Sequence, residues 1–384
     1  MILAISICCL AYLLVMILKA GLALSYAASE ERADPAGLKD ETVTIAQAIL
    51  SGDPGLETML ESNLSSLSGQ RFLWLCDDHD EEARRVTARL IASHPGEKIT
   101  VLLCPPCPPA RNPKVFKLIH GSSQVDTPFL LVLDDDTHLP RATAATLIHH
   151  ARSHDIATGL PQYEPGDNLP SSLLAQFVNN NSAMTYLSLL PFAPPISING
   201  MCYAMKSADR AIFEAIGHHL TDDLALATAI QARGGSIHQS AYPQRIATRV
   251  KDLAHYARMT HRWHLFALLL LRKQPPRYRA AIFLLHGWHP LVLWALLACL
   301  LAAPSWPATA IVAGFLLVRA ALIRIVQRRL FHQTLHLPGV SLLSEMLQPL
   351  HLVHAALVKI IDWRGRRYRV FASDHFTDAA HDNA

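Results

Sequence analysis

An uncharged run at the N-terminus is the feature that most constrains this chain. Residues 2–18 contain no charged side chain, and after Lys19 the apolar character continues to Ala28. A helix of this length can cross a hydrocarbon core of about 30 Å. A cleaved signal peptide is the alternative, but such a peptide carries a basic segment before its apolar run, and here only Met1 precedes the run. We therefore predict an uncleaved transmembrane anchor over residues 1–28.

Further apolar runs lie in the last third of the sequence. Residues 280–303 lack Lys, Arg, Asp and Glu, and a short uncharged link joins them to an apolar segment at 306–326. Together they predict a transmembrane hairpin over residues 280–326. Residues 264–279 begin with an apolar run too short to span and predict an interfacial helix. Residues 327–384 predict an interfacial or re-entrant helix, with a further span as the alternative, followed by a basic tail.

The basic residues around these runs predict an orientation. They precede the hairpin, follow it and follow the last apolar segment: Arg272, Lys273, Arg277 and Arg279; Arg328 and Arg329; Arg364, Arg366, Arg367 and Arg369. All three groups share one side if the hairpin crosses the membrane and the last segment does not. Basic loops favour the cytoplasmic side, so we expect residues 30–265 there too. Arg319 and Arg324, near the end of the hairpin, are expected to extend their side chains to the interface.

Residues 29–263 contain no spanning run and are expected to form one folded domain. Short apolar stretches alternate with helical patterns at 81–93 and 142–153, and the alternation predicts an α/β fold with a largely parallel sheet. In such sheets, ligands bind beyond the carboxyl ends of the strands. The apolar stretches that predict strands are 43–49, 72–75, 99–103 and 129–133.

Composition excludes several other classes of protein. Hydrophobic residues make up 51% of the chain and charged residues 17%, which is the opposite of a disordered sequence. The net charge of +3 gives no indication of a nucleic-acid partner. Seven cysteines in 384 residues are too sparse for a disulfide scaffold. The sequence therefore predicts a membrane protein with a large folded domain outside the bilayer.

Three consecutive aspartates follow the predicted strand at 129–133. Because alternate residues of an extended segment point the same way, Asp134 and Asp136 are expected to face one pocket. Mg²⁺ and Mn²⁺ prefer oxygen ligands and are commonly held by one or two carboxylates together with substrate phosphates. The pattern therefore indicates a metal–diphosphate site. An acidic turn that caps a helix is the alternative, and this motif alone does not decide between them.

Two later motifs carry further charged side chains. Asp222 and Asp223 open a helical pattern that ends near Arg233, so they are either capping residues or, in a pocket, candidates for a general base. The segment 258–263 combines Arg258, Arg262 and Trp263. Arginine suits phosphate oxygens, and Trp can pack on a sugar. The alternative is an ordinary basic helix beside the membrane.

The order of the motifs resembles one known family. In order and spacing the chain resembles the ceramide glucosyltransferase family, among the family 2-like, GT-A-fold glycosyltransferases, from about Thr44 to Trp263 and more weakly at 362–369. The resemblance implies a GT-A fold with membrane helices on both sides in the sequence. The motifs that carry it are the acidic cluster 77–80, Asn112-Pro113-Lys114, Asp134-x-Asp136, Gly159-Leu160-Pro161, Asn199-Gly200-Met201, Asp222-Asp223 and the segment 258–263.

The resemblance also implies roles for individual residues. Asp223 would be the general base that takes the proton of the acceptor hydroxyl, and Arg262 and Trp263 would close over the diphosphate and the acceptor. Asp134 and Asp136 would bind the divalent metal, Mg²⁺ or Mn²⁺. The remaining residues of the donor site would be Asp78 and Asp80, which hold the uridine of a UDP-sugar, together with Lys114 and Arg258.

The implied activity is an inverting transfer of a single glucose or N-acetylglucosamine from a UDP-sugar to a lipid hydroxyl. Met259 stands where the family has Gln or Arg, so we expect a divergent bacterial branch, near enzymes that glycosylate hopanoid lipids, whose acceptor need not be ceramide. The expected location is the bacterial inner membrane, with the catalytic domain cytoplasmic. Two alternatives remain: a processive polysaccharide synthase, for which the spans are few, and a catalytically inactive membrane scaffold.

Overall fold

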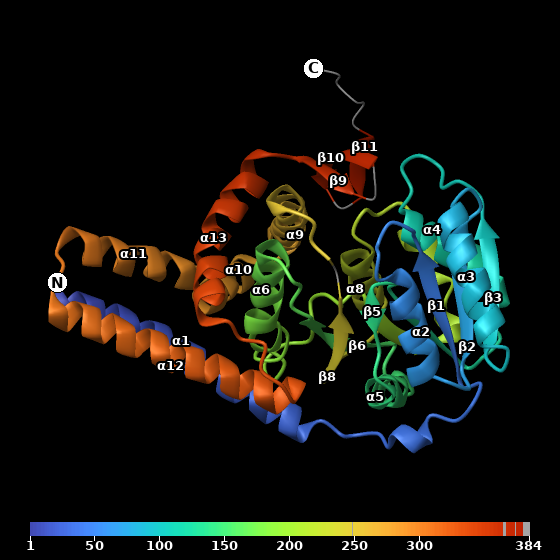
Figure 1. The fold of residues 1–384 in the computed structure, drawn as a ribbon, viewed down its shortest axis with the longest axis horizontal. Coiled ribbons are helices and arrows are strands. Elements are labelled where there is room, and N and C mark those ends of the chain that lie inside the picture. Colours follow the sequence, from blue (N-terminus) through green and yellow to red (C-terminus); the bar gives the residue numbers. More distant parts are fainter. Residues whose placement is uncertain (248, 364–365, 373, 379–384) are drawn as a thin grey trace. The chain divides into compact units, whose positions relative to one another are not determined.

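The computed structural model describes all residues except 248, 364–365, 373 and 379–384, and the chain divides into two compact units. We call them the helical unit and the sheet unit; Figure 1 labels their elements. The helical unit comprises Met1–Ser29, Pro165–Ala193 and Val250–Lys359, and the sheet unit comprises Glu30–Glu164, Pro194–Arg249 and Ile360–Ala384.

A mixed, mostly parallel sheet of eight strands organises the sheet unit. Strand β1 pairs in parallel with β2 and β4, β2 with β3, and β6 with β8, whereas β7 is antiparallel to both β4 and β6. This sheet confirms the predicted α/β class. The strands, in their order across the sheet, are β3 (Lys98–Cys104), β2 (Arg71–Asp77), β1 (Val43–Ile49), β4 (Phe129–Leu133), β7 (Cys202–Lys206), β6 (Ile156–Tyr163), β8 (Ile237–Ile246) and β5 (Thr137–His138).

Helices cover both faces of this sheet. Side chains alternate between the faces, so Phe72 and Trp74 join one core cluster while Leu73 and Leu75 join another. The first cluster includes residues of α2, α3 and α5, and the second includes residues of α4, α7 and α8. These helices are α2 (Leu56–Ser66), α3 (Glu81–Ser93), α4 (Pro113–Gly121), α5 (Arg141–Ala151), α7 (Ile212–Ile216) and α8 (Asp222–Ala232).

The helical unit contains the helices that can cross a membrane. By length and composition α1 and α12 suffice alone, and the segments 276–287 and 289–302, which meet at a bend of 44°, form a third candidate span if counted together. Helices α1 and α12 run side by side (Figure 1). The helices of this unit are α1 (Ile2–Ser29), α6 (Leu169–Tyr186), α9 (Leu253–Lys273), α10 (Pro276–Ile282), α11 (His289–Ala302), α12 (Trp306–Phe331) and α13 (Pro338–Leu357), with a π-helical turn, Phe283–Gly287, after α10.

The units differ from the domain boundaries that the sequence suggested. The expected domain over residues 29–263 is interrupted, because α6 packs against α13, α9 and α12 and so belongs to the helical unit. The expected interfacial helix at 264–279 is divided as well. Its first part continues α9, which starts at Leu253, and its second part begins α10.

The expected basic tail contains regular structure. After α13 the chain forms a three-stranded antiparallel sheet of β9 (Ile360–Trp363), β10 (Arg366–Ala372) and β11 (His375–Asp378). In β10, Tyr368 and Val370 are buried while Arg369 between them is exposed. That alternation is the signal for a strand with one buried face. Arg364 and Gly365 of the tail motif lie outside the described residues.

Candidate active site

A buried ammonium group ties together three loops at one end of the sheet. The Lys114 Nζ lies 2.7 Å from Oδ1 of Asp134 and 3.3 Å from Oδ2 of Asp222, and it donates a 2.5 Å hydrogen bond to the Gly200 carbonyl. The Lys114 side chain is only 6% exposed. Burial alone would lower the pKa of this lysine, but the carboxylates of Asp134 and Asp222 outweigh burial and raise it. Lys114 is therefore a permanent cation.

The motif Asn112-Pro113-Lys114 places that cation by capping a helix. Oδ1 of Asn112 accepts hydrogen bonds from the backbone N–H groups of Lys114 and Val115, the first turn of α4, and Pro113 suits the first helical position. Nδ2 of Asn112 donates to the carbonyls of His219 and Leu220, 3.1 Å away in each case. One buried side chain thus joins the start of α4 to the loop that leads into α8.

Asp223 lies in the first turn of α8, next to the Asp222 that pairs with Lys114. Oδ1 of Asp223 accepts a 2.8 Å hydrogen bond from the Leu224 N–H. Burial and the neighbouring charge of Asp222 raise the pKa of Asp223 to about 7, against the opposing effects of the Leu224 N–H and of Lys114. A carboxyl group with a pKa near neutrality can accept a proton and then release it. Asp223 thus meets both alternatives: it accepts a hydrogen bond from an N–H of the first turn of α8, and its raised pKa suits a general base.

Gly200 packs directly against this acidic pair. A Cβ atom at position 200 would lie 3.1 Å from Cβ of Asp223 and 3.7 Å from Oδ2 of Asp222. The loop is held by Asn199, whose Oδ1 accepts a hydrogen bond from the Met201 N–H. The close approach explains why a residue without a side chain suits this position.

The three aspartates after β4 have different roles. Asp134 faces Lys114, whereas Oδ2 of Asp135 accepts a 2.7 Å hydrogen bond from the Leu50 N–H and so holds the end of β1. Asp136 is partly exposed, and its Oδ1 accepts a hydrogen bond from the Thr137 hydroxyl. The middle aspartate is therefore structural, and the outer two remain candidates for a metal site.

A divalent metal ion fits the donor set that these outer aspartates provide. Both offer carboxylate oxygens, which Mg²⁺ and Mn²⁺ prefer, and both are partly open to solvent. Asp134 is oriented by its contact with Lys114, as metal-binding carboxylates commonly are by a second group. Two carboxylates leave the other coordination positions to water and phosphate oxygens, the usual arrangement for Mg²⁺.

The acidic cluster 77–80 divides into exposed and structural residues. Asp78 is half-exposed and lies 3.1 Å from Nδ1 of His79. Asp80 caps α3 through the Ala83 N–H and also accepts a hydrogen bond from the Ser51 N–H. Burial opposes the charge of Asp80, but these N–H donors lower its pKa. Asp80 thus joins the end of β1 to α3, and its carboxylate is already engaged.

Sequence reasoning missed a second buried lysine. Nζ of Lys117 lies 2.8 Å from Oδ2 of Asp77 and donates a 2.8 Å hydrogen bond to the Ile49 carbonyl. Its side chain is 2% exposed. A signal for it existed, because Lys117 follows Lys114 by three positions and residues at that spacing share one face of a helix.

The remaining predicted site residues belong to α9 in the helical unit. Arg258 is exposed, Arg262 and Trp263 are partly buried, and the Trp263 ring stacks on Phe177 of α6, with 6.1 Å between the ring centroids. The structure thus brings Lys114, Asp134, Asp222 and Gly200 of the sheet unit into direct contact. Within the helical unit, Arg258, Arg262 and Trp263 lie together on α9.

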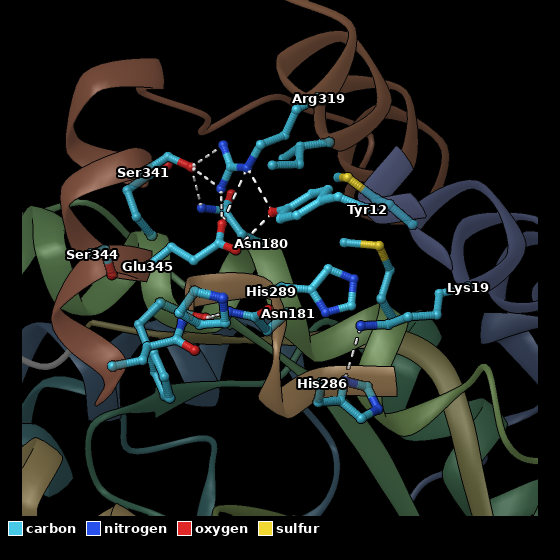
Figure 2. Close-up of a pocket in the computed structure, with 17 residues that line it drawn as sticks. Tyr12, Lys19, Asn180, Asn181, His286, His289, Arg319, Ser341, Ser344 and Glu345 are labelled. Carbon is cyan, nitrogen blue, oxygen red and sulfur yellow. Dashed lines mark hydrogen bonds and ion pairs between the residues drawn. The ribbon is translucent and has the colours of Figure 1, made fainter. Parts of the chain in front are cut away.

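A polar pocket lies within the helical unit, among helices α1, α6, α11, α12 and α13 (Figure 2). Nη2 of Arg319 lies 2.5 Å from Oε2 of Glu345, and the Tyr12 hydroxyl donates a 2.6 Å hydrogen bond to Oε1 of the same carboxylate. Arg319 also donates to the hydroxyls of Tyr12 and Ser341. The cavity of about 40 Å³ has room for a few water molecules.

This pocket corrects the expectation for Arg319. The side chain does not extend to the interface, because it is 4% exposed and its guanidinium is engaged by Glu345, Tyr12 and Ser341. Its acidic partner Glu345 lies in α13, the helix that forms within residues 327–384. Arg324, further along α12, is exposed.

Comparisons with known proteins agree with this architecture. The family described as glycosyl transferase family 21 matches residues 1–375. A mannosyltransferase, PcManGT from Pyrobaculum calidifontis, solved with GDP-Man and Mn²⁺, is 18% identical with a TM-score of 0.53, and the match covers 93% of this chain and 98% of that one.

Two further structures match less well. S. aureus TarS 1–349 with UDP-GlcNAc is 11% identical over 88% of this chain and 99% of its own, with a TM-score of 0.36. A mycobacterial protein is 12% identical over 68% and 80%, with a TM-score of 0.37. The comparison with curated proteins gives no match. At these identities the mannosyltransferase supports the GT-A fold, while the whole-length match supports the family and its enzyme class. The chain belongs to glycosyl transferase family 21, and it is a glycosyltransferase.

Proposed function

We propose that this enzyme transfers one sugar, glucose or N-acetylglucosamine, from a UDP-sugar to the hydroxyl group of a ceramide- or hopanoid-like lipid, with inversion at the anomeric carbon. The observation that carries the proposal is the carboxyl group of Asp223, whose pKa is raised to about 7, beside the pair of Lys114 and Asp134. The site belongs to a chain with helices of membrane-spanning length. The proposed location is a bacterial inner membrane, with the sheet unit on the cytoplasmic side.

In the proposed reaction Asp223 is the general base. The acceptor hydroxyl oxygen forms a bond to the anomeric carbon while its proton passes to a carboxylate oxygen of Asp223. The bond between the anomeric carbon and the phosphate oxygen breaks, and its electron pair leaves with UDP. A single displacement of this kind inverts the anomeric centre. A positioned base contributes about 10²–10⁴-fold to such a step.

The leaving diphosphate requires charge neutralisation. We propose that Asp134 and Asp136 hold a divalent cation, which would neutralise the charge that develops on the leaving group. Lys114 fixes the orientation of Asp134 and is a positioning residue, because its ammonium already contacts two carboxylates and a carbonyl. Asp78 is the proposed contact to uridine, and Asp80 supports it from the cap of α3.

The acceptor and the second half of the donor site are proposed to involve α9. Arg258 and Arg262 offer guanidinium groups to phosphate oxygens, and Trp263 offers an aromatic face to a sugar or lipid. The GDP-Man and Mn²⁺ bound by PcManGT support a nucleotide-sugar donor and a divalent metal. A lipid acceptor is supported by the apolar helices α1 and α12 in the same chain.

The test is transfer of radiolabel from UDP-glucose and UDP-N-acetylglucosamine into extractable lipid, by membranes that contain the wild-type protein, with and without Mn²⁺. We expect a labelled lipid of one added sugar that requires the metal, and a loss of about 10²–10⁴-fold in Asp223→Asn. Glu82→Gln is the matched control, because Glu82 lies in the first turn of α3 and is exposed.

The other outcomes separate the alternatives. A labelled polymer that does not partition as a lipid would support a processive synthase. Full transfer by Asp223→Asn would remove this residue from its role as base. Absence of both label and Mn²⁺-dependent UDP binding by the folded protein would support an inactive scaffold.

A further inference from the structure

Three histidines and a glutamate that take no part in the proposed transfer lie together in the sheet unit. His150 is in the last turn of α5, His154 follows that helix, and His238 lies near the start of β8. One ring nitrogen of each can be chosen so that all three lie within 4.8 Å of one another. Glu30 joins them: its Oε1 lies 3.0 Å from Nε2 of His238 and 3.6 Å from Nε2 of His150.

These separations are close to those of a metal's first coordination sphere. Tetrahedral Zn²⁺ binds imidazole nitrogen and carboxylate oxygen at about 2.0–2.1 Å, which places neighbouring ligand atoms about 3.3–3.4 Å apart. The two measured separations around Glu30, 3.0 and 3.6 Å, lie on either side of that value. The rings of His150 and His238 are stacked, with 3.6 Å between their centroids, so one ring must rotate before both nitrogens can point at a single ion.

Backbone hydrogen bonds orient two of the rings. Nδ1 of His154 lies 3.1 Å from the His150 carbonyl, which leaves its Nε2 available as a ligand. His150 makes a backbone hydrogen bond with Glu31, and its Nε2 has no hydrogen-bond partner among the described residues. Metal-binding histidines commonly use their second nitrogen in this way, which fixes the ring and the tautomer.

The charges of the cluster also favour a cation. The Glu30 side chain is 1% exposed, and a buried carboxylate is costly without a counter-charge. Its Oε2 accepts a 2.7 Å hydrogen bond from the Ala241 N–H, which leaves Oε1 directed at the histidines. A divalent cation bound by these four side chains would supply that counter-charge.

We propose that His150, His154, His238 and Glu30 form a closed, four-coordinate site for Zn²⁺ or a similar transition-metal ion. Imidazole ligands suit Zn²⁺, whereas the oxygen-only pair Asp134 and Asp136 suits Mg²⁺ or Mn²⁺, so the two sites select different ions. The site has no open position for a substrate and is structural. It would fix Glu30, the first residue of the sheet unit, to α5 and β8.

The experiment measures metal content of the full-length protein in detergent, purified through a tag that contains no histidine. We expect about one Zn²⁺ per chain after dialysis, and at least a tenfold lower affinity in His154→Ala and His238→Ala. His149→Ala is the matched control, because His149 is on the same helix but is not part of the cluster. The double variant Asp134→Asn/Asp136→Asn should retain the Zn²⁺.

Replacement by Co²⁺ gives a second readout. A tetrahedral site of three nitrogens and one oxygen should give intense visible absorption bands that are absent in His154→Ala. A chelator should lower the Tm of the wild type but not that of the folded His154→Ala protein. The proposal is overturned if folded wild-type protein binds no Zn²⁺ or Co²⁺, or if the metal content is the same in His154→Ala and His149→Ala.

Discussion

Lys114 in the sheet unit and Arg319 in the helical unit are both buried cations, and they have different surroundings. In the sheet unit Lys114 contacts Asp134 and Asp222, and a further carboxyl group, that of Asp223, is adjacent to them in the chain. In the helical unit Arg319 contacts the single carboxylate of Glu345. The tyrosine and serine hydroxyls around it complete the hydrogen bonds of the pair.

The surroundings of Lys114 and Arg319 differ in the number of carboxyl groups for each positive charge. The group around Lys114 holds more carboxyl groups than this one lysine can neutralise, and burial together with the charge of Asp222 raises the pKa of Asp223. The pair of Arg319 and Glu345 is balanced and can join helices without binding a proton. A buried ion pair at neutrality supports packing, whereas a local excess of carboxylates creates a group able to do proton chemistry.

The largest effect is expected from replacement of Lys114. Lys114→Met leaves Asp134 and Asp222 without a counter-charge, so we expect the free energy of unfolding to fall by about 3–5 kcal/mol and transfer to be lost. Lys98→Met is the control, since this lysine is half-exposed, and a change within about 0.5 kcal/mol is expected. Equal losses in the two variants, measured by thermal denaturation in detergent, would contradict the assigned role.

A smaller effect is expected when Arg319 is removed from its pair with Glu345. Arg319→Met leaves Glu345 with its hydrogen bond from Tyr12, and the carboxyl group can take up a proton, so the expected loss of stability is about 1.5–3 kcal/mol. The double variant Arg319→Met/Glu345→Met removes both charges and should recover most of that loss. The exposed Arg324→Met should have little effect. No recovery in the double variant would show that the pair stabilises the helices beyond neutralisation.

The pH dependence of kcat/KM tests whether the neighbouring carboxylate raises the pKa of Asp223. Only ionised Asp223 accepts a proton, so kcat/KM should fall about tenfold per pH unit below the pKa of this group, near 7. The charge of Asp222 raises that pKa, so Asp222→Asn should move the acid limb to lower pH. An acid limb in Asp222→Asn that coincides with that of the wild type would refute the electrostatic explanation.

The smallest effect is expected from steric crowding of the acidic pair. In Gly200→Ala the new Cβ would lie 3.1 Å from Cβ of Asp223, which should cost about 1 kcal/mol of stability and a few-fold in kcat. Gly96→Ala is the control, because a Cβ there meets no atom within 4 Å among the described residues. A stability of Gly200→Ala equal to that of Gly96→Ala would mean that the loop adapts without cost.

Much of the sheet unit could be predicted from local patterns. The predicted strand at 43–49 coincides with β1, that at 129–133 coincides with β4, and the predicted helix at 81–93 coincides with α3. Apolar runs and helix caps are local properties, so the sequence carries them directly. The carboxyl end of the predicted strand at 129–133 also identified Asp134 as a candidate site residue.

Features that depend on distant partners could not be predicted in this way. The sequence alone does not distinguish the role of Asp135 from those of Asp134 and Asp136, because the partner of Asp135 is the N–H of the distant Leu50. Arg319 was expected at the interface because the sequence does not show that its partner is Glu345, 26 residues later. The assignment of α6 to the helical unit likewise depends on packing against α13, more than 150 residues later in the chain.

The hydrogen bonds of Asn112 connect two parts of the candidate site. Its amide uses two N–H donors and two lone pairs at once, holding the first turn of α4 and the segment before α8. The proposed metal-binding carboxylate, which Lys114 contacts, and the proposed base Asp223 therefore both depend on hydrogen bonds to one amide side chain. If the proposed roles hold, loss of these hydrogen bonds would weaken donor binding and slow proton removal in the same variant.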